Sequence, residues 1–149
     1  MQWKPNVVVA AIIERNGEFL VVEEVAENGQ VVINQPAGHL EQNETLFEAV
    51  EREVLEETQW RFRPEGIVGV YLLSKPNTVI TYMRVCFWGR CFDHDPSRAL
   101  DRGIVRTAWM TRDALLSIKH KHRSHLVLRC VDDYLAGRHY PLDLIRHVE

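Results

Sequence analysis

Hydrophobic residues are spaced in a strand-like way over most of the first third of the chain. Two segments rich in β-branched residues, 7–15 and 18–24, are separated by Asn16-Gly17, a dipeptide that suits a tight type I′ hairpin turn. A shorter apolar segment at 31–34 stops before Pro36. Further along, alternating apolar positions predict strands at 66–74, 79–92 and 104–109, with a turn at Pro76-Asn77 between the first two.

Helical spacing appears three times. Residues 45–58 read as a helix with Asn43 or Glu44 near its start, and two more helices are predicted at 112–118 and 124–136. Gly137 suits the position just after the last of these helices. Strands mixed with a few helices, without strict strand–helix alternation, favour one α/β domain over residues 1–149 with a mixed sheet.

Composition excludes several classes of protein. Hydrophobic residues make up 46% and charged residues 26% of the 149 residues, which is typical of a globular domain. The longest apolar run, Val7–Ile13, is far shorter than the ~20 residues that span a bilayer. No basic cluster precedes it and no small-residue cleavage site follows it, so an export signal is not expected. The three cysteines lack C-x-x-C spacing and read as buried thiols in a reducing compartment. We expect a cytoplasmic protein without membrane contact.

The net charge of −3 conceals an acidic segment. Residues 41–57 contain seven Glu and one Arg. On a helical wheel at roughly 100° per residue, Leu46, Val50 and Val54 form one apolar stripe on the 45–58 helix. Three carboxylates fall within this stripe or close to it, namely Glu53, Glu56 and Glu57. Burial of a carboxylate is costly unless the group is paired or coordinated.

The simplest interpretation is a solvated acidic helix with an Arg52–Glu56 pair, worth ~0.3–0.5 kcal/mol. This interpretation suits Glu48 and Glu51, which point away from the stripe. It suits the other three glutamates poorly, because one arginine cannot neutralise three converging carboxylates. Hard carboxylate oxygens are the ligands that Mg²⁺ or Mn²⁺ prefers, and no EF-hand loop pattern is present. The sequence therefore predicts a divalent metal site on this helix.

The spacing of these residues has a known counterpart. Gly38, five residues, Glu44, seven residues, and then Arg52-Glu53-Val54-Leu55-Glu56-Glu57 resemble the Nudix box, the signature of the Nudix hydrolases, here over residues 38–60. One fixed position departs from the pattern, because Gln59 stands where the family usually has Gly. A left-handed Gln costs ~1 kcal/mol relative to Gly. This departure affects the backbone at position 59 and leaves all of the carboxylates in place. Three further segments resemble the bacterial phosphatase NudJ subgroup: 19–24, 34–41 and the tail Tyr134…Gly137…Tyr140-Pro141-Leu142.

The resemblance implies a fold, an activity and a set of roles. The fold is a three-layer α/β/α sandwich with a mixed sheet, and the activity is Mg²⁺-dependent cleavage of a diphosphate linkage, with Mn²⁺ as a substitute. The implied metal ligands are Glu53, Glu56, Glu57 and the Gly38 carbonyl. Arg52 would position a glutamate and Glu44 would support it. Glu53 is the preferred general base, and Asp101 in a later loop is its rival.

Substrate recognition is less evident in the sequence. Glu23, Asn34 and Gln35 lie on strands leading to the box, where they would line a pocket or simply form strand-edge polarity. The resemblance implies phosphate release from nucleoside tri- and diphosphates and from the hydroxymethylpyrimidine pyrophosphate of thiamine synthesis. Alternatives are a pyrophosphohydrolase of nucleotide sugars, dinucleoside polyphosphates or RNA 5′ ends, and a nucleotide-sensing domain without turnover. We expect a monomer that acts on small molecules. Binding of longer nucleic acids is not expected, because the basic run at 119–125 lies apart from the aromatic residues.

Overall fold

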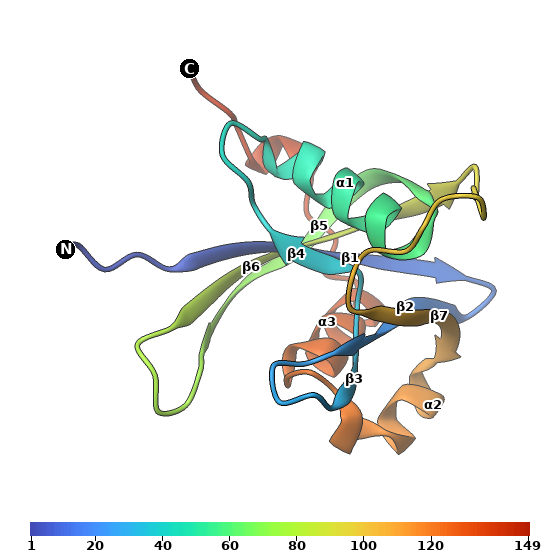
Figure 1. The fold of residues 1–149 in the computed structure, drawn as a ribbon. Coiled ribbons are helices and arrows are strands. Elements are labelled where there is room, and N and C mark those ends of the chain that lie inside the picture. Colours follow the sequence, from blue (N-terminus) through green and yellow to red (C-terminus); the bar gives the residue numbers. More distant parts are fainter.

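The computed structural model describes all residues, 1–149, and is built on seven strands and three α-helices (Figure 1). The strands are β1 (Asn6–Arg15), β2 (Glu18–Val25), β3 (Val31–Asn34), β4 (Ala37–His39), β5 (Arg61–Ser74), β6 (Thr81–Phe92) and β7 (Ile104–Thr111). The helices are α1 (Leu46–Thr58), α2 (Arg112–Ser117) and α3 (Leu126–Leu135), with short 3₁₀ turns η1 (Lys119–Lys121) and η2 (Leu142–Leu144).

The strands form one mixed sheet. Its order is β3-β2-β1-β6-β5, with β4 paired to β1 and β7 paired to β2. The β1–β6 pair is parallel and the other pairs are antiparallel. In Figure 1 α1 lies on one side of the β1–β6 region, whereas α3 lies on the other side together with α2. The α/β fold with a mixed sheet that the sequence indicated is confirmed.

Strand β1 lies at the centre of the core because both of its faces are buried. Val9 and Ala11 face α1 in one hydrophobic cluster, whereas Ala10 and Ile12 face α3 in a second one. This two-sided burial explains why the run Val7–Ile13 is continuously apolar instead of alternating. Because β4 pairs with β1 through Val9 and Gly38, the central strand also fixes the position of the segment that leads into α1.

Several sequence predictions can be compared with the structure directly. Asn16 and Gly17 both have positive φ, 54° and 80°, as a type I′ turn requires. Strand β4 was not predicted, because three residues between Pro36 and Leu40 are too short to show an alternating pattern. Strand β5 begins at Arg61, five residues before the predicted start. The prediction missed these residues because register shifts near Pro64 and Ile67 interrupt the alternation of the strand.

Helix α1 begins one residue later than the predicted start region. Thr45 is its N-cap, and not Asn43 or Glu44, and its hydroxyl accepts the Glu48 N–H at 3.1 Å. The Glu48 carboxylate accepts the Thr45 N–H at 2.9 Å in return, which completes a capping box. The three cysteines are buried free thiols, as expected. None of the helices is both long and apolar enough to cross a membrane.

Removal of the cap should weaken α1 measurably. We expect Thr45→Ala to lower the free energy of unfolding by about 1 kcal/mol, because the Glu48 N–H loses its acceptor at the helix start. Urea denaturation followed by circular dichroism measures this change. Thr45→Ser keeps the hydroxyl and should stay close to the parent protein; equal losses in both variants would contradict the capping role.

Candidate catalytic site

The buried face of α1 carries two carboxylates. Glu53 and Glu57 are only 8% and 6% exposed, because they lie among residues that pack against the sheet, such as Val50 and Val54. The helical wheel thus located these glutamates correctly. Apolar packing of the same helix face holds both carboxylates out of water.

The segment before α1 is shaped around these carboxylates. The Ala37 N–H donates to Glu57 Oε1 at 3.0 Å. A Cβ atom on the neighbouring Gly38 would collide with the carboxylate of Glu53. A side chain at position 38 would therefore displace the Glu53 carboxylate, and glycine leaves room for it beside β4.

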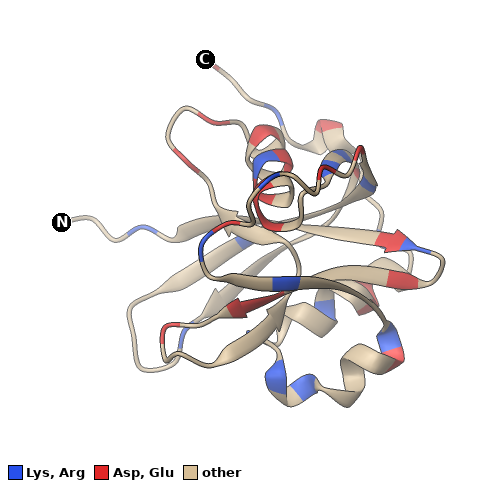
Figure 2. Cartoon of the chain, turned by 45° about the vertical axis from the view of Figure 1, so that its right-hand side comes forward, with Lys and Arg blue, Asp and Glu red and all other residues tan.

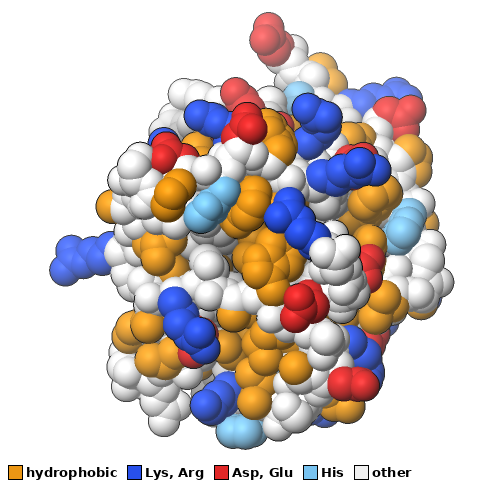
Figure 3. All heavy atoms as spheres, turned by 90° about the vertical axis from the view of Figure 1, so that its right-hand side faces the viewer, with side chains coloured by type: hydrophobic (Ala, Val, Ile, Leu, Met, Phe, Trp, Pro, Cys, Tyr) orange, Lys and Arg blue, Asp and Glu red, His pale blue; other side chains and the backbone are white.

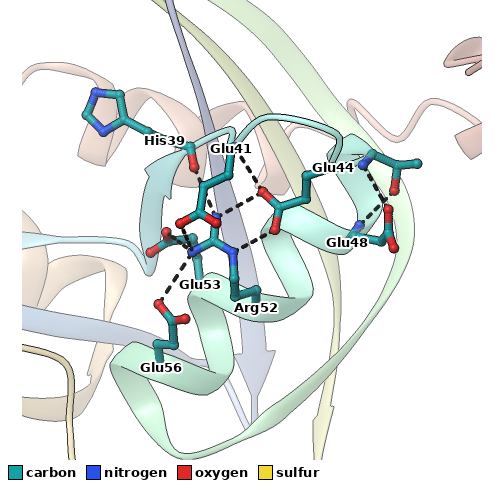
Figure 4. Close-up of polar contacts among 8 residues, drawn as sticks. His39, Glu41, Glu44, Glu48, Arg52, Glu53 and Glu56 are labelled. Carbon is teal, nitrogen blue, oxygen red and sulfur yellow. Dashed lines mark hydrogen bonds and ion pairs between the residues drawn. The ribbon is translucent and has the colours of Figure 1, made fainter.

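Arg52 lies at the centre of the acidic cluster, where it forms hydrogen bonds with four groups and a longer ion pair, at 3.6 Å, with Glu41 (Figure 4). Its guanidinium contacts both oxygens of Glu44 at 2.6 and 3.0 Å, and it donates to the His39 carbonyl at 3.1 Å. The Nη1 atom donates to Glu53 at 2.6 Å and to Glu56 at 3.4 Å. Arg52 thus contacts both glutamates, and the positioning role that the resemblance implied for it stays a prediction.

The electrostatics of the two buried carboxylates differ from those of surface glutamates. Burial, helped by the neighbouring charges of Glu53, Glu24 and Asp101, raises the pKa of Glu57 to about 9, against the lowering by the Ala37 N–H. Burial likewise raises the pKa of Glu53 to about 7, although its bond to Arg52 acts in the opposite direction. One guanidinium does not compensate this cluster fully, so added positive charge would stabilise it.

Asp101 reaches the cluster through a loop that is fastened to the end of α1. The Asp101 N–H donates to the Glu56 carbonyl at 2.8 Å. Earlier in the loop, the Asp95 N–H donates to the Gln59 carbonyl at 2.9 Å, and the Gln59 side chain donates to the Arg98 carbonyl. Gln59 is left-handed, with φ 67°, in the position that the family pattern reserves for glycine. The departure from the pattern therefore supplies an anchor for the loop that carries Asp101.

The three residues that we expected near the substrate lie in two places. Glu23 pairs with Arg106 of β7, away from the α1 carboxylates. Asn34 and Gln35 are buried instead, and their side-chain oxygens accept hydrogen bonds from Arg84 at 3.0 and 2.8 Å. Strand-edge polarity describes neither Glu23, which pairs with Ile33 of β3 and with Arg106 of β7, nor the two buried amides.

Sequence reasoning missed Arg84 and Glu24. Arg84 is 5% exposed and lies between Met83 and Val85 in an apolar strand. A single arginine within this apolar stretch was the sequence signal that could have identified it. Glu24 accepts from Asn34 at 3.1 Å and contributes to the raised pKa of Glu57. Only the strand pairing brings Glu24 near the α1 carboxylates, and the sequence carried no signal for it.

The donor set suits a hard divalent cation. No group of three Asp, Glu, His or Cys side chains is already arranged as metal ligands, because Glu53 and Glu56 turn toward Arg52 while Glu57 accepts the Ala37 N–H. The carboxylates nevertheless converge, Glu53 and Glu57 are buried, and neighbouring carboxylates help to raise the pKa of these two. Carboxylate oxygens are the ligands that Mg²⁺ and Mn²⁺ prefer in proteins.

The acidic residues of segment 41–57 lie on α1 and on the loop that leads to it. Figure 2 shows acidic positions along α1 and the segment that leads to it, with basic positions spread over the rest of the chain. On the face drawn in Figure 3, acidic and basic side chains are interspersed around a band of hydrophobic ones. A hollow of about 370 Å³ lies elsewhere, lined by residues such as Arg15, Trp88 and Tyr134, and it contains none of the α1 carboxylates.

The raised pKa values predict a pH dependence of stability in metal-free protein. Glu57 ionises near 4.5 in the unfolded chain but only near 9 in the fold, so its contribution is complete below pH 4.5 and is lost as pH rises through 9. We expect the Tm of the metal-free protein to fall between pH 5 and 9, and Glu57→Gln to flatten this fall. Asp113→Asn, at a side chain that is 95% exposed, is the control. A fall of equal size in Glu57→Gln would contradict the argument.

Gln59 has an unfavourable left-handed backbone conformation, but its side chain holds the loop that carries Asp101. We expect Gln59→Gly to change the free energy of unfolding by less than about 1 kcal/mol, because relief of the left-handed conformation offsets the lost hydrogen bonds. Gln59→Ala gains no relief and should be less stable than the Gly variant by about 1 kcal/mol. In both variants the Asp101 amide should exchange its hydrogen faster. Urea denaturation and hydrogen exchange measure the two effects, and equal stability of the Ala and Gly variants would refute the assignment.

Comparison with known proteins agrees with this geometry. The family model described as the NUDIX domain matches residues 3–130. The Escherichia coli K12 protein named Phosphatase NudJ is 36% identical over 143 residues, which cover 96% of this chain and 92% of that protein.

Solved structures with the same fold include both near and distant relatives. A NUDIX hydrolase from Nitrosomonas europaea has a TM-score of 0.95 at 45% identity, covering 97% of this chain and 98% of that one. A bifunctional NMN adenylyltransferase/ADP ribose pyrophosphatase from Francisella tularensis, solved with AMP and a Mn ion, has a TM-score of 0.64 at 20% identity, covering 91% of this chain and 42% of that one. From the family match, the overall identity and the box on α1, the chain belongs to the Nudix hydrolase family.

Proposed function

We propose that the protein hydrolyses phosphoanhydride bonds with the help of Mg²⁺, for which Mn²⁺ can substitute, and releases phosphate from nucleoside tri- and diphosphates. One observation carries the proposal: Glu53 and Glu57 are buried together beside Gly38 and near Asp101, with too little positive charge to compensate them. Such an arrangement is costly for a helix that only packs. It is useful for a helix that binds a cation.

The proposed cation ligands are the three glutamates that face β4 and the Asp101 loop, together with the Gly38 carbonyl. Glu53 and Glu57 lie on the buried side, and Glu56 lies at the solvent edge with a side chain that is 37% exposed. When bound, a divalent cation supplies positive charge against the phosphate oxygens and acidifies a water molecule. The protein's own contribution is to hold the carboxylates in place and largely out of water.

Two further groups would support these carboxylates. Arg52 holds Glu53 and Glu56 by direct hydrogen bonds, and Glu44 holds Arg52 through both of its oxygens. We assign the proton-accepting role to Glu53, whose carboxylate is buried and is held in place by its hydrogen bond to Arg52. Asp101 is the rival base, held near the cluster by its bond to the Glu56 carbonyl.

The substrate class in the proposal rests on the similarity to Phosphatase NudJ, which extends over 96% of the chain. We extend the proposal to the hydroxymethylpyrimidine pyrophosphate of thiamine synthesis, as the resemblance implied. The reaction products distinguish this activity from the alternatives. Release of orthophosphate supports a phosphatase. Pyrophosphohydrolases of nucleotide sugars, dinucleoside polyphosphates or RNA 5′ ends cleave instead at an inner linkage. A nucleotide sensor without turnover is disfavoured, because the box carboxylates are all retained.

The proposal predicts a large loss of rate when one carboxylate is neutralised. We expect Glu56→Gln and Glu57→Gln each to lower the rate of phosphate release by at least ~10²-fold, because charge that faces the cation is lost. Glu51→Gln, on the same helix but pointing to solvent, is the matched control and should keep the parent rate. The measurement is phosphate release with Mg²⁺ from a panel of nucleotides, thiamine-pathway pyrophosphates and nucleotide sugars, with circular dichroism to verify folding.

Chelation of the cation provides an independent test. We expect EDTA to abolish phosphate release and added Mg²⁺ or Mn²⁺ to restore it. Full activity in EDTA, or in both glutamine variants, would refute the metal site.

A further inference from the structure

The C-terminal segment, residues 138–149, runs from the edge of the sheet to the start of α1. At the edge strand β5, the Ile67 N–H donates to the Tyr140 carbonyl and the Tyr140 N–H donates to the Ile67 carbonyl, both at 2.8 Å. Leu142 and Ile145 then pack against the hydrophobic cluster that α1 covers. In Figure 1 the η2 turn of this segment lies beside the first turn of α1. The segment therefore lies on the same face of the sheet as the α1 carboxylates.

His147 supplies a hydrogen-bond acceptor to α1. The N–H groups at the start of a helix have no acceptor within the helical backbone. The capping box provides acceptors for the N–H groups of Thr45 and Glu48. The Leu46 N–H donates instead to Nε2 of His147 at 3.1 Å, 101 residues along the chain. This bond therefore ties the first residue of α1 to a segment outside the helix.

The ring of His147 also lies against an aromatic pair. Its centroid is 5.2 Å from that of Phe47, in an edge-to-face arrangement. Phe47 in turn packs against Phe87 of β6, with the ring centroids 5.7 Å apart. Because Phe87 is fully buried, Phe47 is held between the core of the sheet and His147. The first turn of α1 is thus fixed from two sides.

The start of α1 also determines where Glu44 lies. Residues 41–45 form no backbone hydrogen bond with any strand, so the sheet does not fix this loop. Glu44, which belongs to the loop, holds the Arg52 guanidinium with both of its oxygens at 2.6 and 3.0 Å. Arg52 in turn donates to Glu53 at 2.6 Å and to Glu56 at 3.4 Å (Figure 4). A loosened first turn would release Glu44 from Arg52 and thereby free the two glutamates.

We propose that His147 is a positioning residue for the proposed cation ligands: by accepting the Leu46 N–H, it holds the first turn of α1 and thereby keeps Glu44 on Arg52. The inference rests on the proposed function, because it concerns the glutamates assigned there. His147 acts through the helix and contacts neither the cation nor the substrate. A neutral ring that accepts at Nε2 carries its proton on Nδ1, so this tautomer is the one that the bond requires.

The experiment separates the acceptor atom of His147 from the packing of its ring. His147→Phe keeps a ring beside Phe47 and removes the acceptor, whereas His147→Gln places an amide oxygen near the position of Nε2. In His147→Phe we expect the Leu46 amide to exchange its hydrogen about fivefold faster, because one hydrogen bond of ordinary strength is lost. The Arg52 Nε–H, which donates to Glu44, should also exchange faster. His147→Gln should exchange like the parent protein at both groups.

Cation binding and turnover supply the second readout. In His147→Phe we expect the Kd of Mn²⁺, measured without substrate, to rise by at least about threefold. The kcat for phosphate release from ATP with Mg²⁺ should fall by at least about threefold, with KM for ATP within about twofold of the parent value. His147→Gln should retain the parent values. His120→Phe is the matched control, because His120 is exposed on η1, and it should leave every value unchanged.

Three results with these variants would overturn the inference. Equal changes in His147→Phe and His147→Gln would mean that the ring only packs. An unchanged Leu46 exchange rate in His147→Phe would mean that His147 is not the acceptor. Faster exchange at Leu46 alone, with Arg52 exchange and Mn²⁺ affinity unchanged, would mean that His147 only caps the helix.

A measurement on the parent protein does not depend on the variants. Nitrogen NMR spectra should show the His147 ring with its proton on Nδ1, and the Nε2–H tautomer would overturn the inference. Failure of the parent protein to release phosphate or to bind Mn²⁺ would instead refute the proposed function. The exchange rates of the Leu46 amide and the Arg52 Nε–H would then still decide whether His147 positions Glu44.

Discussion

The fold depends on keeping two carboxylates out of water under α1. Glu53 and Glu57 occupy positions that would otherwise be filled by apolar side chains, and three devices make this tolerable. The guanidinium of Arg52 binds Glu53, the Ala37 N–H binds Glu57, and glycine at position 38 leaves room for the helix to approach the strand. With apolar side chains in place of these two carboxylates the same helix would pack more stably, so the arrangement exchanges stability for a site.

The scaffold around this helix is correspondingly firm. Strand β1 is buried on both faces, pairs with β4 and β6, and lies between the two hydrophobic clusters. The capping box of Thr45 and Glu48 fixes the start of α1, and Gln59 fastens the loop that carries Asp101 to its end. The carboxylates are therefore positioned by rigid elements on every side, as a site that must hold ligands in a fixed geometry requires.

The segment from Asn34 to Gly38 has two environments, one on each face of the sheet. Its first two residues meet a buried guanidinium under α3, and its last two meet the buried carboxylates under α1. Opposite charges are thus separated by a short piece of backbone that pairs with β1 only at Ala37 and Gly38.

The sequence alone determined the hairpin at Asn16-Gly17, the two-sided burial of the first strand and the face of α1 that carries the glutamates, because these depend on local periodicity and on residues a few positions apart. The spacing from Gly38 to Glu57 was likewise sufficient for the family. Tertiary structure alone decided the pairing of β4, the anchoring of the Asp101 loop by Gln59, and the meeting of Arg84 with Asn34 and Gln35, which are about 50 residues away. Such contacts join segments distant in the chain, and no local pattern specifies which strand will lie beside which.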